Sequence, residues 1–208
     1  MGITPKKVLV ACEFSQVVTR AFRERGHEAY SCDILPTEGN PEWHIQDDVL
    51  KHLNDGWDMM IAHPPCTYLA VSGAAWFDSP RYPTRRNDQK EAARFFIQLA
   101  NAPIDKIAIE NPVCIMSSLW RTPDQIIQPY YFGDEASKKT CLWLRNLPLL
   151  RYGKEVQMCF GENRPPQTLV VGKGEFITHK SGKTKPKWYA EVAFLPTEER
   201  RKARSKTF

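Results

Sequence analysis

A short apolar run that ends in two prolines and a cysteine constrains this chain more than any other stretch. Met59–Ala62 indicates a buried β-strand, and His63, Pro64, Pro65 and Cys66 follow it. Proline donates no hydrogen bond to a sheet, so the strand must end here. Open α/β sheets bind ligands at such strand ends, which favours a reactive Cys66. The alternative is a buried structural thiol, because free cysteine is among the most buried residue types.

A second predicted strand ends in the same way. Ile107–Ile109 is apolar and is followed by Glu110, Asn111 and Pro112. If the two strands are neighbours in the sheet, Glu110 and Cys66 converge on one small substrate.

The first third of the chain alternates strand, helix and strand. Lys7–Ala11 and Glu28–Cys32 are the predicted strands, and Gln16–Arg25 is the predicted helix. The second strand ends at Asp33, where such units often bond the ribose of a nucleoside cofactor. The alternative is an ordinary β-α-β unit in which Asp33 caps a turn.

The rest of the chain continues this alternation. Further helices are predicted over Leu50–Trp57, Gln89–Ala100, part of Trp120–Tyr131 and from Thr197, and a strand over Cys141–Leu144. The pattern predicts an α/β fold with a mostly parallel sheet.

These motifs resemble those of the DNA cytosine-C5 methyltransferases, in particular the small phage-encoded proteins of that family. The similarity lies in Pro64-Pro65-Cys66 after one strand and Glu110-Asn111 after a later one. It implies a Rossmann-like S-adenosylmethionine-dependent methyltransferase fold with a small basic C-terminal extension. It also implies that Cys66 attacks C6 of cytosine while Glu110 holds N3 and donates a proton to it. Amino-methyltransferases, which also use a Pro-Pro motif, need an aromatic residue where Cys66 stands.

The resemblance adds Pro65 and Lys138 to the catalytic set. Counted from Gly133, Lys138 falls on the first arginine of the family's Gln-x-Arg-x-Arg motif, and Thr140 falls on the second. Lysine still supplies a cationic donor there, whereas Thr140 does not.

The resemblance also assigns the cofactor, S-adenosylmethionine. Asp33 would bond its ribose and Asp48 its adenine amino group. The expected cofactor contacts are Ala11, Cys12, Glu13, Phe14, Ser15, Asp33, Ile34, Asp48, Val49 and Pro64. The segment 11–15 departs from the family because it contains no glycine. A methyl donor has no phosphates to cradle, so a glycine-rich loop is less necessary than for a dinucleotide.

Two basic regions favour DNA as the partner. The long segment Thr67–Asp88 contains three arginines, and in the family the corresponding loop closes over DNA. Residues 151–208 carry a net charge of +7, against −2 for residues 1–150, with basic loops predicted at 172–174 and 180–187. The expected nucleic-acid contacts are Arg81, Arg85, Arg86, Lys139, Lys173, Lys183, Lys185 and Lys187. The alternative is that both regions are solvated basic surface.

Composition sets the remaining expectations. The 208 residues suit a catalytic domain over 1–150 and a reduced target-recognition segment over 151–208. The six cysteines form no CxxC pair, so neither a metal site nor a disulfide scaffold is expected. No apolar run approaches the ~18 residues of a membrane span, and no signal-peptide pattern precedes Lys7. A cytoplasmic monomer is expected, inside a bacterial host if the chain is phage-encoded.

Two other functions remain open from the residues. One is a nucleic-acid-binding protein that keeps the fold without catalysis, which the glycine-free first motif and Thr140 favour. The other is a C5 methyltransferase that acts on RNA or on a free nucleotide.

Overall fold

The computed structural model describes residues 4–152, 171–178, 182–192, 195–196 and 199–200. The chain divides into two compact units. The first consists of Met1–Ile126 with Thr140–Pro148, and the second of Ile127–Lys139 with Leu149–Phe208. The predicted roles of residues 1–150 and 151–208 stay predictions.

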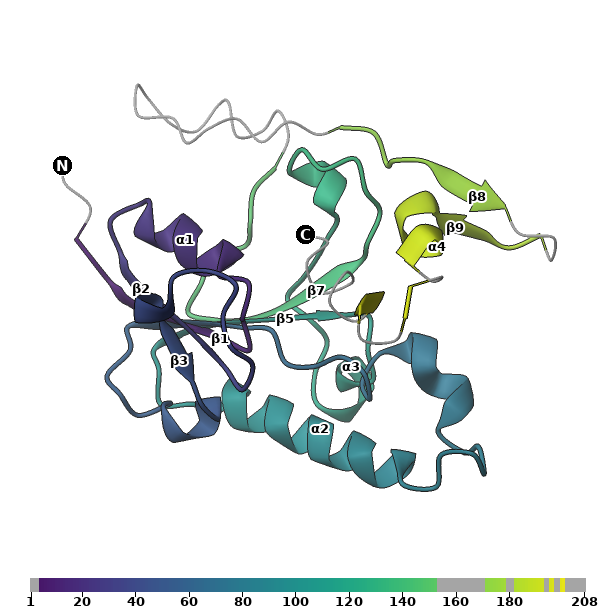
Figure 1. The fold of residues 1–208 in the computed structure, drawn as a ribbon, viewed down its shortest axis with the longest axis horizontal. Helices are drawn as coiled ribbons and strands as arrows, with labels where there is room; N and C mark the ends of the chain where they lie inside the picture. The colour runs from purple at the N-terminus through teal and green to yellow at the C-terminus, as the bar shows by residue number, and fades with distance from the viewer. Residues whose placement is uncertain (1–3, 153–170, 179–181, 193–194, 197–198, 201–208) are drawn as a thin grey trace. The chain divides into compact units, whose positions relative to one another are not determined.

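A seven-stranded sheet forms the centre of the fold (Figure 1). Its strands are β1 (Lys7–Ala11), β2 (Glu28–Asp33), β3 (His44–Gln46), β4 (Met59–Ala62), β5 (Lys106–Pro112), β6 (Gln125–Ile127) and β7 (Thr140–Arg145). The spatial order is β3-β2-β1-β4-β5-β7-β6. The pairs from β3 to β5 are parallel, and β7 runs antiparallel to β5. The predicted α/β class with a mostly parallel, Rossmann-compatible sheet is confirmed.

The strand order reverses between β1 and β4. From β1 the chain moves outward to β2 and β3, and then returns to the other side of β1 to form β4. In open α/β sheets such a reversal leaves a crevice at the carboxyl ends of the strands. Ala11 is level with Cys32 on β2 and with Ala62 on β4. The residues that follow these three positions therefore lie at the same carboxyl edge of the sheet.

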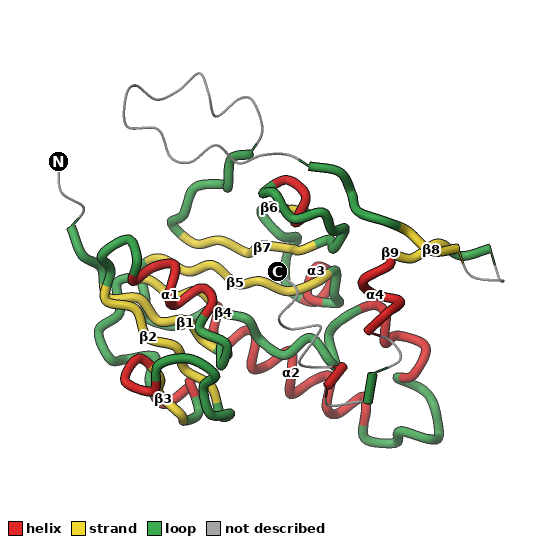
Figure 2. Tube along the Cα trace, turned by 45° about the horizontal axis from the view of Figure 1, so that its top comes forward, coloured by secondary structure: helices red, strands yellow, loops and turns green. Residues whose placement is uncertain are grey.

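Alternate residues of β1 lie on the two faces of the sheet. Leu9 and Ala11 belong to the larger buried cluster, which includes Phe96 and Leu99 of helix α2 (Arg85–Ala100). Val8 and Val10 belong to a smaller cluster that packs against helix α1 (Val17–Arg23). Figures 1 and 2 show α1 and α2 on opposite sides of the sheet. Helix α2 begins four residues before the predicted Gln89.

The helix predicted over Leu50–Trp57 is wrong. Only a 3-10 turn, η2 (Val49–Lys51), forms there. The chain then turns through Gly56 at φ +76°. That turn buries the indole of Trp57, whose Nε1 donates to the backbone oxygen of His52 at 2.7 Å. A continuous helix does not form because the chain turns here to bury the ring.

No α-helix forms within Trp120–Tyr131 either. Helix α3 (Met116–Leu119) ends just before this stretch, which instead contains β6 and the 3-10 turn η4 (Pro129–Tyr131). Pro123 and Pro129 remove backbone donors, and pairing of β6 with β7 supplies partners that a helix would otherwise provide. Two further 3-10 turns are η1 (Pro41–Trp43) and η3 (Val71–Trp76).

The described part of the second unit contains a hairpin and a helix. Strands β8 (Phe176–Thr178) and β9 (Thr184–Pro186) pair antiparallel, and α4 (Lys187–Val192) follows. The prediction that 180–187 is a loop is therefore wrong over residues 184–187. The helix predicted from Thr197 begins outside the described residues.

Candidate functional site

Cys66 lies just beyond the end of β4. Pro64 is buried, whereas Pro65 and Cys66 are exposed. The thiol of Cys66 is not part of a disulfide. The backbone carbonyl oxygen of Cys66 accepts from the backbone nitrogens of Leu69 at 3.0 Å and Ala70 at 2.9 Å, so a tight turn begins at the cysteine. This turn presents Cys66 at the carboxyl edge of the sheet.

Backbone hydrogen bonds join the segment after Cys66 to the segment after β5. The nitrogen of Val71 donates to the oxygen of Val113 at 3.2 Å, and the nitrogen of Ile115 donates to the oxygen of Leu69 at 3.0 Å. The Cys66 turn is therefore fixed to the loop that begins two residues after Asn111.

The two proline-terminated strand ends are also joined by side chains. Asn111, which is 1% exposed, donates from Nδ2 to the oxygen of Pro64 at 2.7 Å. The backbone nitrogen of His63 donates to the oxygen of Ala11 at 2.9 Å, which extends the pairing of β4 with β1. The diproline therefore has a defined position between β1 and β5.

Glu110 lies beside His63 at the same edge. Oε2 of Glu110 is 3.3 Å from Nδ1 of His63, and the side chains are 26% and 28% exposed. Nε2 of His63 is buried and has no hydrogen-bond partner among the described residues. Glu110 pairs in register with Leu142 of β7, and the preceding residue, Ile109, pairs with Ala62 of β4.

The pKa of the Cys114 thiol is affected by both Cys66 and Glu110. Burial raises the pKa of the Cys114 thiol to about 11, and the charges of Cys141, Cys66 and Glu110 add to the rise. Cys114 therefore lies within electrostatic reach of both predicted catalytic groups. The structure places Cys66 and Glu110 at the same edge of the sheet, as their positions after two strands predicted, and their catalytic roles stay predictions.

The predicted cofactor segment after β1 is a compact turn. Cys12 has a left-handed φ of 60°, and its nitrogen donates to the oxygen of Cys32 at 2.7 Å. The carboxylate of Glu13 accepts from the nitrogens of Val18 at 2.7 Å and Thr19 at 3.2 Å. The side chain of Glu13 therefore caps α1, which leaves the backbone groups of this residue for the predicted cofactor contact. Ser15 is half-buried beside it.

The turn is also tied to the loop after β2. The carbonyl oxygen of Phe14 accepts from the nitrogen of Glu38 at 3.0 Å and from Oγ1 of Thr37 at 2.9 Å. The loops after β1 and β2 are thus held together.

Asp33 and Ile34 stand at the carboxyl end of β2. Burial raises the pKa of the Asp33 carboxyl above its ordinary value, and Oδ1 accepts from the nitrogen of Leu35 at 2.9 Å. Ile34 is 73% exposed. A half-buried carboxylate next to an exposed apolar side chain is suited to a ribose and a flat ring.

Asp48 and Val49 follow β3. Oδ1 of Asp48 accepts from the nitrogen of Leu50 at 3.0 Å, so this carboxylate caps η2. Val49 is in the core at 4% exposure, which leaves its backbone for any ligand contact.

The three arginines after Cys66 have different surroundings. The guanidinium of Arg85 lies 5.2 Å from the ring of Phe77, 5.5 Å from that of Tyr82 and 5.6 Å from that of Tyr68. Arg86 makes a bidentate contact with Asp78, at 2.9 and 2.6 Å. Arg81 is exposed at the surface.

The predicted lysines belong to the second unit. Lys139, Lys173, Lys183 and Lys185 are exposed, and Lys138 is half-buried. Lys187 is paired with Glu175 at 2.6 Å. Lys180 is outside the described residues.

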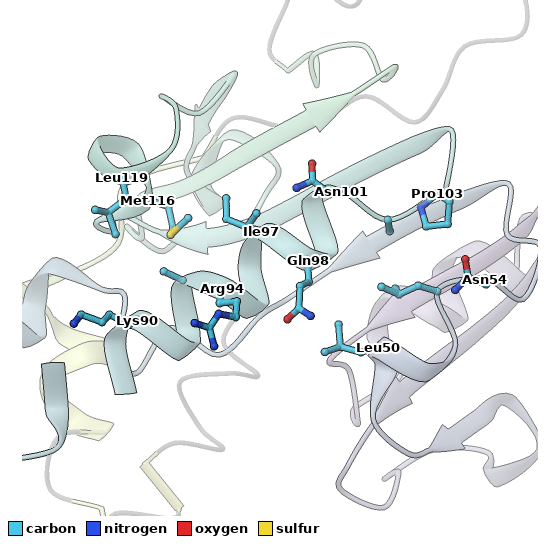
Figure 3. A pocket seen from close by; sticks show the side chains of 13 residues that line it. Leu50, Asn54, Lys90, Arg94, Ile97, Gln98, Asn101, Pro103, Met116 and Leu119 are labelled. Atoms are coloured by element: carbon cyan, nitrogen blue, oxygen red, sulfur yellow. The ribbon is translucent and has the colours of Figure 1, made fainter. Parts of the chain in front are cut away.

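A shallow groove with a volume of about 620 Å³ runs along α2 in the first unit (Figure 3). Leu50, Leu53, Ile97, Met116 and Leu119 form much of its wall. None of the predicted catalytic or cofactor residues lines it.

Two contacts of the site were not predicted from the sequence. Asn111 braces Pro64, and His63 contacts Glu110. The available signal was position: each residue stands directly next to a predicted catalytic motif at a strand end.

Within the described ranges, no three His, Cys, Asp or Glu side chains are grouped so that they could hold a metal ion. None of the described helices has the length and apolar character needed to cross a membrane. Comparison with models of known protein families finds none that matches the chain, and comparison with curated proteins finds no match.

Proposed function

We propose that this chain is an S-adenosylmethionine-dependent DNA cytosine-C5 methyltransferase that works through a covalent bond between Cys66 and C6 of the base. The observation that carries the proposal is the convergence of Cys66 and Glu110 from neighbouring strands, at the edge where the strand order reverses.

These two groups supply what the chemistry requires. C5 of cytosine is a weak nucleophile, and thiolate addition at C6 turns the ring into an enamine-like species that is reactive at C5. As the Sγ–C6 bond forms, Glu110 donates its proton to N3 and becomes a carboxylate. After the methyl group is attached, C5 loses its proton to solvent, N3 returns its proton to Glu110, and the Sγ–C6 bond breaks. Cys66 and Glu110 thus end the cycle as they began it.

The residues after β1 and β2 support a nucleoside-type cofactor. Asp33 would accept from the ribose hydroxyls, and the exposed Ile34 would offer a surface for the adenine. The side-chain oxygen of the buried Asn111 has no hydrogen-bond partner among the described residues, which indicates polar capacity at this edge. S-adenosylmethionine, when bound, would supply the methyl group.

The charge distribution supports DNA as the acceptor. Residues 151–208 carry the excess of lysine and arginine, and phosphate contacts of this kind bind without reading sequence. A cytosine in a duplex must leave the stack before Cys66 can reach C6.

The decisive experiment traps the covalent intermediate. Duplex DNA that contains 5-fluorocytosine is incubated with the protein and S-adenosylmethionine, because fluorine cannot leave C5 as a proton does. A cross-linked species that resists denaturation is expected with the parent and not with Cys66→Ala, while both bind cofactor. Methyl transfer by Cys66→Ala would contradict the proposal. DNA binding without adduct or methyl transfer would favour the non-catalytic alternative. Labelled methyl groups in RNA or dCMP, but not in DNA, would identify RNA or the free nucleotide as the acceptor.

A further inference from the structure

The contact between His63 and Glu110 is not explained by the fold. Neither side chain is fully exposed, and their atoms meet at 3.3 Å at the edge where the proposed reaction takes place. A histidine three residues before a reactive cysteine could serve as a cationic neighbour that helps the thiol to ionise. The hydrogen bond that the structure gives to the ring of His63 goes instead to Glu110.

The position of the imidazole is fixed from the backbone. The nitrogen of His63 donates to Ala11 at 2.9 Å, and the next residue, Pro64, is held by Asn111. Glu110 is fixed independently by pairing of β5 with β4 and β7. Two separately anchored strands therefore bring the ring and the carboxyl group together.

Burial of Nε2 indicates where the ring carries its proton. A carboxylate only accepts hydrogen bonds, so the proton between the two groups belongs to Nδ1 when Glu110 is ionised. A doubly protonated ring would also leave a buried N–H at Nε2 without a partner, which is unfavourable. The geometry favours a neutral ring protonated at Nδ1.

We propose that His63 is a positioning residue for Glu110: its Nδ1–H orients the carboxyl group and stabilises the carboxylate that forms when Glu110 gives its proton to N3. The inference rests on the proposed function. No proton leaves His63, so the balance of the reaction is unchanged. A charge-assisted hydrogen bond shortens and strengthens as the acceptor gains charge, so the benefit falls on the chemical step rather than on binding.

The kinetic test uses two amide variants that separate the ring nitrogens. The amide nitrogen of Asn at position 63 can occupy the place of Nδ1, whereas that of Gln reaches toward the place of Nε2. We expect His63→Gln to lower kcat by about 10- to 100-fold with KM within about twofold. His63→Asn should keep kcat within about threefold of the parent. Equal impairment of the two variants, or a parent-like His63→Gln, would overturn the inference.

A spectroscopic test does not depend on activity. Long-range 15N–1H correlation of the imidazole rings, with His63 assigned from the spectrum of His63→Asn, shows which nitrogen is protonated. The Nδ1–H form is expected near neutral pH, with a shift of that signal in Glu110→Gln. The Nε2–H form would overturn the inference even if methyl transfer is observed.

The outcomes also separate this inference from the proposed function. Adduct formation on 5-fluorocytosine DNA by the parent supports the function whatever His63 does. Absence of adduct from a protein with an Nδ1–H ring would refute the function while the contact itself stands, and the catalytic role given to His63 would then be overturned.

Discussion

The side-chain amide of Asn111 donates a 2.7 Å hydrogen bond to the backbone oxygen of Pro64. It thereby connects the end of β5 to the diproline that precedes Cys66. The carbonyl before Pro65 cannot pair with a strand neighbour through a regular ladder, because proline ends the strand. Asn111 supplies the missing donor from inside the core, where it is 1% exposed.

The first prediction removes this donor. Asn111→Ala should lower the free energy of unfolding by about 1 to 3 kcal/mol, because the oxygen of Pro64 loses its partner in a buried position. It should also lower kcat, since the position of Cys66 depends on the diproline. Urea unfolding and methyl-transfer kinetics measure the two effects.

Asn111→Asp is the matched control. It keeps the volume of the side chain but replaces the donating amide with an accepting carboxylate. It should be at least as destabilised as Asn111→Ala. Parent-like stability of Asn111→Asp would show that the hydrogen bond contributes nothing to the fold.

The sequence predicted the sheet well where its elements are buried. β1 and β4 have the predicted bounds, because continuous apolar runs between polar residues leave little choice of register. The position of Cys66 and Glu110 after neighbouring strands followed from the same logic. β7 was predicted as a strand, but its antiparallel direction depends on long-range pairing that no local pattern encodes.

Other parts depended on contacts that the sequence does not display. Burial of Trp57 replaced a predicted helix by a turn, since the indole finds its partner in His52. The carboxylate of Glu13, a predicted cofactor contact, caps α1 from three residues before the cap position, which no local pattern indicated. The aromatic surroundings of Arg85 likewise depend on a loop conformation that composition alone could not indicate.

The second prediction concerns Asp33 and the cofactor. Asp33→Ala should weaken S-adenosylmethionine binding by about 1.5 to 3 kcal/mol, the range for a hydrogen bond to a charged group. Because burial raises the pKa of this carboxyl above its ordinary value of 3.8, the loss of binding on acidification should begin at a higher pH than for an ordinary aspartate. Calorimetry of the folded variant measures both effects.

Asp33→Asn separates charge from shape. It keeps an oxygen that can accept from Leu35, so the loop after β2 should stay intact. Its affinity should fall between those of the parent and Asp33→Ala. An unchanged affinity in both variants would place the cofactor elsewhere.

The third prediction concerns the buried thiols. Burial raises the pKa of Cys32 to about 12 and that of Cys114 to about 11, from an ordinary 9.0. The unfolded chain therefore loses these protons first as pH rises. Their contribution to stability is complete below pH 9.0 and is lost as pH rises through 11 to 12.

Two measurements check this expectation. The free energy of unfolding should fall as pH rises from 9.0 to about 12, and the fall should be smaller in Cys32→Ala because one buried thiol is gone. Iodoacetamide near neutral pH should modify Cys66 before Cys32 and Cys114, since the thiolate is the reactive form. An equal fall in the parent and in Cys32→Ala, or earlier labelling of Cys114, would contradict the assignment.

The last prediction separates the arginines of the loop after Cys66. All three are predicted to contact phosphates, and they differ in their surroundings. In the described part of the chain Arg81 is exposed and no carboxylate pairs with its guanidinium, which lies 5.6 Å from the ring of Tyr82. Arg81→Ala should reduce the log–log salt slope of DNA binding by about 0.9, the value for one phosphate contact.

Arg85→Ala should leave the slope unchanged and instead lower the free energy of unfolding by about 0.5 to 2 kcal/mol, through lost contacts with three rings. Arg85→Lys is the control, because it keeps the charge and loses the planar group that packs against the rings. If Arg85 is an internal anchor, the lysine variant will be destabilised with an unchanged salt slope. If Arg85 binds phosphate, the alanine variant will lose slope as Arg81→Ala does, while the lysine variant will retain the slope and the stability of the parent.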